Sequence, residues 1–154
     1  MGKKRSKYRP RPVMRDTMHW VKSGFYKVDG HPATADLALS NHTAMDVLRQ
    51  GEATMVDMKV LADMLNVMEA LTEVNPAFGE DYSAEIEAAQ AAMMSLVARC
   101  KERGVFTCTA AELDALRVAI ELHDAQLEIA TVNDIAEAMK NIKSVVSSGK
   151  ATHL

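Results

Sequence analysis

The stretch TAAELDALRVAIELHDAQLEIATVND, residues 109–134, decides the fold because it contains two helix starts and one complete helix between them. It begins at Thr109 with Glu112 three positions later, and it ends with Thr131 and Asp134 at the same spacing. In such a capping box, the threonine oxygen and the carboxylate each satisfy a free amide at a helix N-terminus. The residues between the boxes follow the helical period. Their polar stripe consists of Asp114, Arg117, Glu121, Asp124 and Glu128.

The same kinds of signal predict further helices outward along the chain. Thr54 and Asp57 form a third capping box ahead of a run of apolar residues at helical spacing. Pro76 and Gly104 act as helix stops. His42 lies close to the expected start of the first helix and is predicted to cap it, with contact to a partner as the alternative. The expected helices span residues 37–50, 54–74, 82–103, 109–130 and 131–147.

Five helices joined by short links predict an all-α fold, a compact bundle with mostly antiparallel neighbours. We expect the bundle domain over residues 31–148 and a frayed tail over residues 149–154. Residues 1–30 are predicted to form an extended basic N-terminal arm, called the basic arm below. Pro10 and Pro12 favour extended backbone there.

The composition excludes several classes of protein. Seven residues are aromatic and eleven are methionine, and this balance favours helices over strands. No apolar run approaches the roughly 18–20 residues that a membrane-spanning helix needs, and no secretion signal follows the charged N-terminus. Cys100 and Cys108 are expected to be reduced, buried thiols. We therefore expect a soluble cytoplasmic protein with no membrane partner.

Charge is divided unevenly along the chain. Residues 1–27 hold nine Lys and Arg against one acid, a formal charge of +8, whereas residues 28–154 hold nine against twenty, a formal charge of −11. The split indicates an arm that binds an anionic partner. The residues expected to contact nucleic acid are Lys3, Lys4, Arg5, Lys7, Arg9, Arg11 and Arg15. The alternative is a tail that aids solubility or binds the protein's own acidic body.

Aromatic residues gather at the end of the basic arm. Trp20, Phe25 and Tyr26 lie among basic residues. We expect these aromatic side chains to anchor the arm on the helical body. The alternative is that they stack on single-stranded nucleobases.

Three polar residues interrupt otherwise apolar helix faces. His123 and Gln126 lie opposite the polar stripe of their helix, and Gln90 lies on the apolar side of the preceding one. A buried polar group must find a partner, because leaving it unpaired costs about 1–3 kcal/mol. The pattern therefore predicts a buried network of Gln90, His123 and Gln126. Three interpretations remain open: a network that fixes helix register, a polar seam in a homodimer or partner interface, and a ligand site.

No sequence motif predicts an enzyme. The chain lacks a P-loop, a Gly-x-Gly-x-x-Gly loop and a Gly-x-Ser-x-Gly turn. Glu121 and His123 are two residues apart and lie on different helix faces, and the Glu-x-x-His pattern of di-iron bundles does not occur. We expect no catalytic residue, no metal and no cofactor.

Four stretches resemble a group of small uncharacterised helical proteins encoded by bacteriophages and prophages. They are KYRPRP at residues 7–12, QGEAT at 50–54, LNVMEAL at 65–71 and ELHDAQ at 121–126. The resemblance implies an accessory role in the cytoplasm of a bacterial host. It supplies no catalytic residues.

Two hypotheses of function follow. In the first, a non-enzymatic accessory protein binds nucleic acid or a nucleoprotein through its basic arm, while the helical body dimerises or holds a partner. In the second, the acidic body is the contact surface of an inhibitor or adaptor, for example one that acts on a host or defence factor.

Overall fold

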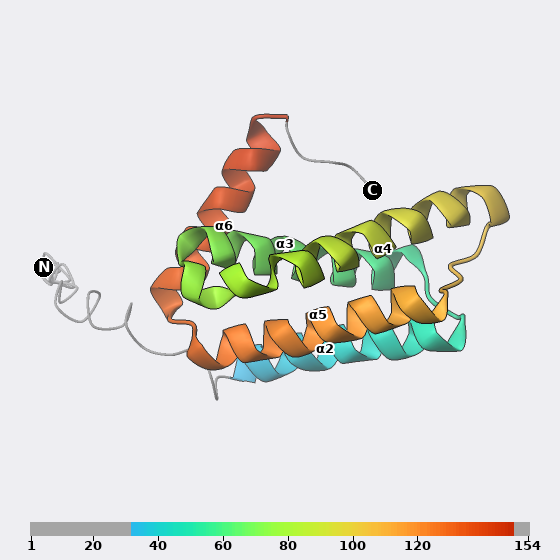
Figure 1. Ribbon diagram of the computed structural model, residues 1–154, viewed down its shortest axis with the longest axis horizontal. Coiled ribbons are helices and arrows are strands. Elements are labelled where there is room, and N and C mark those ends of the chain that lie inside the picture. The colour runs from blue at the N-terminus through green and yellow to red at the C-terminus, as the bar shows by residue number, and fades with distance from the viewer. Residues whose placement is uncertain (1–31, 150–154) are drawn as a thin grey trace, which may run out of the picture.

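The computed structural model describes residues 32–149, and the basic arm and the tail beyond residue 149 lie outside this range. The described chain is an all-α bundle without strands (Figure 1), so the predicted fold class is confirmed. Two single 3-10 turns, η1 (Pro76–Phe78) and η2 (Glu80–Tyr82), replace the loop expected after Pro76. The helices are α2 (Pro32–Gln50), α3 (Met55–Val74), α4 (Ser83–Arg103), α5 (Ala110–Ile129) and α6 (Val132–Ser147).

The first four helices form two layers. Figure 1 shows α2 beside α5 in one layer and α3 beside α4 in the other, with consecutive helices antiparallel. Helix α3 contacts each of the other four helices. Helix α6 packs on α3, and its C-terminal part projects away from the two layers. None of the helices described is both long and apolar enough to span a lipid bilayer.

All three predicted capping boxes are formed. The backbone amides of Thr54, Thr109 and Thr131 donate to the carboxylates three residues later, over 2.7, 2.8 and 2.8 Å. Each box fixes where its helix begins, because it satisfies amides that have no partner within the helix. Helices α3, α5 and α6 begin one residue after these threonines, as the sequence predicts.

Glu112 connects the start of α5 to α4. Its carboxylate also receives two hydrogen bonds from the guanidinium of Arg99, over 2.7 and 3.0 Å, and Arg99 donates to the carbonyl of Thr107 as well. The Arg99 side chain and the Thr109 cap lower the pKa of Glu112 to about 2. This ion pair is largely shielded from solvent, since the two side chains are 22% and 14% exposed.

Helix α2 begins five residues earlier than the predicted position 37. Proline is well tolerated in the first turn of a helix, because its missing N–H would have no helical partner there and its φ is already helical. Pro32 is accordingly the first residue of α2. His42 consequently lies inside α2 and does not cap it. Its Nε2 atom lies 2.8 Å from a carboxylate oxygen of Asp124 on α5.

The apolar core has two parts. The larger part lies between α2, α3, α4 and α5 and includes Leu48, Leu61, Leu96 and Leu116. The smaller part joins the end of α3 to η1 and α6, around residues such as Leu71, Phe78 and Ala138. Ala138 is the one fully buried side chain of α6, so this helix is held by one narrow face.

Candidate functional site

His123 and Gln126 lie together in the core. Both side chains are buried, and Nδ1 of His123 lies 3.4 Å from Oε1 of Gln126. An amide oxygen can only accept, so Nδ1 of His123 is the donor. The amide nitrogen of Gln126 donates to the carbonyls of Phe78, at 2.7 Å, and Met68, at 3.3 Å. Gln126 thus connects α5 to α3 and to η1.

Gln90 lies outside this buried pair, and the expected three-residue network is corrected in this respect. Its side chain is partly exposed on α4 and donates to a carboxylate oxygen of Glu69 on α3, over 3.0 Å. Gln90 is four residues from Ile86 and three from Met93, so it borders the buried face of α4 without entering the core. The helical period alone does not distinguish a residue at the border of a buried face from a residue inside the core.

Asn41 is a buried polar residue that sequence reasoning missed. It lies on α2 one residue before His42, and its side chain is fully buried. Neither of its amide atoms has a hydrogen-bond partner in the described chain, and neither does Nε2 of His123. Asn41 is spaced three and seven residues from the buried Ala44 and Leu48. The expected helix over residues 37–50 already contains these three positions, so their spacing was a signal in the sequence that pointed to burial of Asn41.

The buried polar residues show no catalytic arrangement. Burial lowers the pKa of His123, against smaller opposing effects of Gln126 and Asp124, so the imidazole is neutral at pH 7. Within residues 32–149, no three His, Cys, Asp or Glu side chains are grouped to hold a metal ion. Burial also raises the pKa of the Cys108 thiol to about 11, which keeps it protonated. A protonated thiol is a poor nucleophile.

The predicted nucleic-acid contacts lie outside the described residues. They are Lys3, Lys4, Arg5, Lys7, Arg9, Arg11 and Arg15.

The helical body has few Lys and Arg side chains that are available to bind a phosphate. Residues 32–149 contain eight Lys and Arg against nineteen Asp and Glu, a formal charge of −11. Five of the eight are in ion pairs with carboxylates of the body: Arg49, Lys59, Arg99, Arg117 and Lys140. The three described cations without such a pair are Lys101, Arg103 and Lys143.

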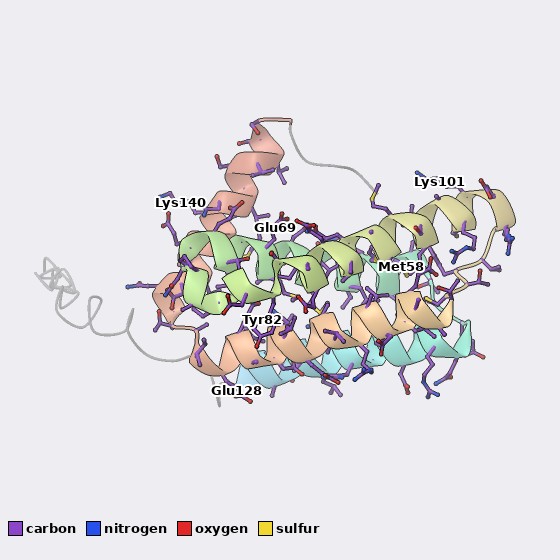
Figure 2. The ribbon with its side chains drawn as sticks, viewed as in Figure 1. Met58, Glu69, Tyr82, Lys101, Glu128 and Lys140 are labelled. Carbon is purple, nitrogen blue, oxygen red and sulfur yellow. The ribbon has the colours of Figure 1, made fainter. Side chains whose placement is uncertain are left out.

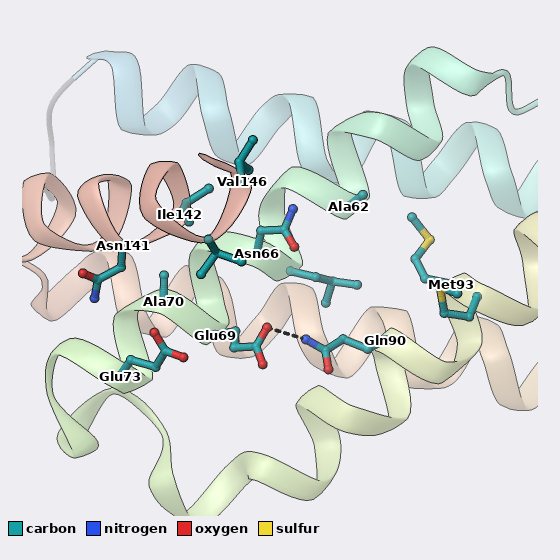
Figure 3. Close-up of a pocket in the computed structure, with 13 residues that line it drawn as sticks. Ala62, Asn66, Glu69, Ala70, Glu73, Gln90, Met93, Asn141, Ile142 and Val146 are labelled. Carbon is teal, nitrogen blue, oxygen red and sulfur yellow. Dashed lines mark hydrogen bonds between the residues drawn. The ribbon is translucent and has the colours of Figure 1, made fainter. Parts of the chain in front are cut away.

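A pocket of about 490 Å³ lies between α3, α4 and α6 (Figure 3), and sequence reasoning did not predict it. Leu65 and Met93 line it from the core, and Ile142 lines it from α6. Several apolar side chains of its lining are about half exposed. They are Met94 at 48%, Val145 at 44% and Val146 at 56%.

The polar groups of the pocket are neutral or acidic. Asn66, Glu69 and Glu73 follow one face of α3, and Figure 3 shows Glu69 and Gln90 pointing toward one another across the space. No Lys, Arg or His of residues 32–149 lines the pocket. Figure 2 shows Glu69 beneath the projecting part of α6, while Lys140 lies on the outer side of that helix. The pocket thus has an apolar lining with two carboxylates and no compensating cation.

No family model, curated protein or solved structure matches this chain. The resemblance to phage-encoded proteins accordingly stays a prediction.

Proposed function

We propose that this protein is a non-enzymatic accessory protein of the phage type that binds nucleic acid, or a nucleoprotein, through its basic arm. The helical body serves for self-association or for binding a protein partner. The observation that supports the proposal is the charge distribution. The described body has a formal charge of −11, and most of its cations are paired with its own carboxylates.

A protein surface of this kind repels a phosphate backbone, so any affinity for nucleic acid must come from elsewhere in the chain. Seven Lys and Arg occur within residues 3–15, and only one acid accompanies the nine basic residues of positions 1–27. Contacts between such a cluster and phosphates do not depend on base sequence. We therefore expect binding with little sequence preference.

The test is a fluorescence anisotropy titration of a labelled, mixed-sequence DNA duplex and of a labelled RNA single strand with the full chain at low salt. In the arm variant, all seven basic residues of positions 3–15 are replaced by Gln. The matched control variant is Lys101→Gln, Arg103→Gln and Lys143→Gln, which removes the described cations that have no ion pair. The arm variant should lose at least about tenfold in affinity, since each phosphate contact adds electrostatic free energy. The control should bind nearly as wild type does.

Equal binding by wild type and the arm variant would overturn the proposal. Absence of binding by wild type to both probes at low salt would do so as well. The first outcome would place the nucleic-acid contacts outside residues 3–15. The second would favour the adaptor hypothesis, in which the acidic body is the contact surface.

A further inference from the structure

We propose that the pocket between α3, α4 and α6 binds a segment of this same chain, residues 14–28, with Trp20 in contact with its apolar lining. This inference goes beyond nucleic-acid binding, because it assigns a place to a part of the chain that makes none of the proposed phosphate contacts except Arg15. Among the described residues, the lining of the pocket has half-exposed apolar side chains and two carboxylates, but no cation.

The chemistry of residues 14–28 complements that of the pocket. The segment contains seven apolar or aromatic residues: Met14, Met18, Trp20, Val21, Phe25, Tyr26 and Val28. Arg15, Lys22 and Lys27 provide three cations against the single acid Asp16. An occupant with these properties would cover apolar surface and place cations near Glu69 and Glu73. Burial of apolar area supplies most of the affinity, and the exposed ion pairs add little.

Two methionines in the lining make an aromatic occupant of the pocket favourable. Met93 and Met94 lie side by side in sequence on α4, and both line the pocket. A thioether is flexible enough to adapt to an aromatic ring, and contacts between sulfur and an aromatic ring are themselves favourable. Trp20 offers the largest such ring in the chain and is its sole tryptophan.

The chain is long enough for the segment to reach the pocket. Trp20 is twelve residues from Pro32, where α2 begins, and twelve residues span up to about 40 Å. The helices of the bundle have 16 to 21 residues, so the longest are about 30 Å long. A tethered segment also experiences an effective concentration on the order of millimolar. It therefore competes well against a second copy or a separate protein present at lower concentration.

Trp20 emission of the full chain tests this proposal. The pocket variant is Glu69→Lys with Glu73→Lys, two exposed positions on α3. The matched control is Glu52→Lys with Glu128→Lys, which makes the same change in net charge at exposed positions outside the pocket. A second variant, Met94→Lys, places a charge on the apolar rim. Far-UV circular dichroism of each variant checks that the helices are retained.

In wild type, Trp20 emission should be shifted to the blue of its value in denaturant and should be protected from quenching by acrylamide. Both pocket variants should shift the emission to the red and increase quenching, with unchanged helix content, while the control resembles wild type. Three results would overturn the proposal. The first is wild-type emission equal to that in denaturant, and the second is pocket variants that leave the emission unchanged. The third is a blue shift that disappears on dilution, which would assign the segment to the pocket of a second copy.

Discussion

At the scale of single residues, the most consequential side chains are the polar ones inside the bundle. Within residues 32–149, both the amide oxygen and the amide nitrogen of Gln126 are in hydrogen bonds, whereas neither amide atom of Asn41 has a partner. His123 has one ring nitrogen without a partner in the same range. A buried polar atom without a partner costs free energy, while one with good partners is close to neutral. Asn41 and Gln126 should therefore respond in opposite directions to apolar substitution.

We expect Asn41→Leu to raise the melting temperature by roughly 2–5 °C, because leucine has a similar volume and leaves no polar atom unpaired. Gln126→Leu is the comparison. It removes the hydrogen bonds to Phe78 and Met68 and the acceptor of His123 Nδ1. The Met68 carbonyl still accepts from the Thr72 hydroxyl, but the Phe78 carbonyl and the imidazole lose their partner, so the substitution should lower the melting temperature. Thermal unfolding followed by circular dichroism measures both. A melting temperature lowered by Asn41→Leu would mean that the amide contributes a favourable interaction.

His123 should make stability depend on pH. Its pKa is lowered in the folded protein because burial disfavours the imidazolium, whereas in the unfolded chain it is about 6.5. The unfolded state therefore binds the proton first, and stability is lost as the pH falls below about 6.5 toward the folded pKa. We expect wild type to lose up to roughly 3–5 °C of melting temperature per pH unit in that window.

His123→Leu should flatten this dependence between pH 6.5 and pH 5. His42→Gln replaces the exposed histidine on the neighbouring helix and measures separately what the other described histidine contributes to the profile. The measurement is the melting temperature of the three proteins across the window. Parallel curves for wild type and His123→Leu would show that His123 is not the group that titrates.

At the scale of elements, helix starts were predictable and contacts between helices were not. A capping box is defined by four consecutive residues. The boxes at Thr54, Thr109 and Thr131 therefore predict where their helices begin without any tertiary information. Pro32 is ambiguous in sequence, because proline suits both a turn and a first helical turn. The helical period places both Gln90 and Gln126 on apolar helix faces. Their surroundings differ in the fold, because Gln126 donates to a backbone carbonyl of α3 inside the core, whereas Gln90 donates to an exposed carboxylate of α3.

Glu112 both caps α5 and holds Arg99 of α4. Glu112→Gln keeps the shape of the side chain but removes the charge that holds Arg99 and strengthens the cap. We expect the melting temperature at pH 7 to fall by roughly 5 °C, because hydrogen bonds to charged groups are the stronger ones. The control is Glu128→Gln at an exposed position of the same helix, which should change it little.

The pH dependence gives an independent check of the same contact. The folded pKa of Glu112, about 2, lies below the usual value near 4.5. Its stabilising contribution is therefore complete above about pH 4.5 and is lost as the pH falls toward 2. The difference in melting temperature between wild type and Glu112→Gln should shrink over this range. A constant difference would mean that the carboxylate charge does not stabilise the contact.

At the scale of the whole molecule, the chain combines a basic N-terminal segment with an acidic helical body. The charge split is visible in the sequence, because it needs only counting. The pocket is not, because its lining combines the consecutive helices α3 and α4 with α6, which is separated from them by the whole of α5. The charge split supports the proposal that residues 3–15 bind nucleic acid. The pocket supports the proposal that residues 14–28 dock on the helical body.

Binding of nucleic acid through the basic arm should make the affinity depend steeply on salt concentration. Each phosphate neutralised on duplex DNA contributes about −0.9 to the slope of log K against log salt concentration. Anisotropy titrations of the full chain at several salt concentrations should give a slope of about −4 to −6 for seven arm cations, and the arm variant should give a slope close to zero. A shallow slope for wild type, or the same slope for both proteins, would contradict binding through the basic arm.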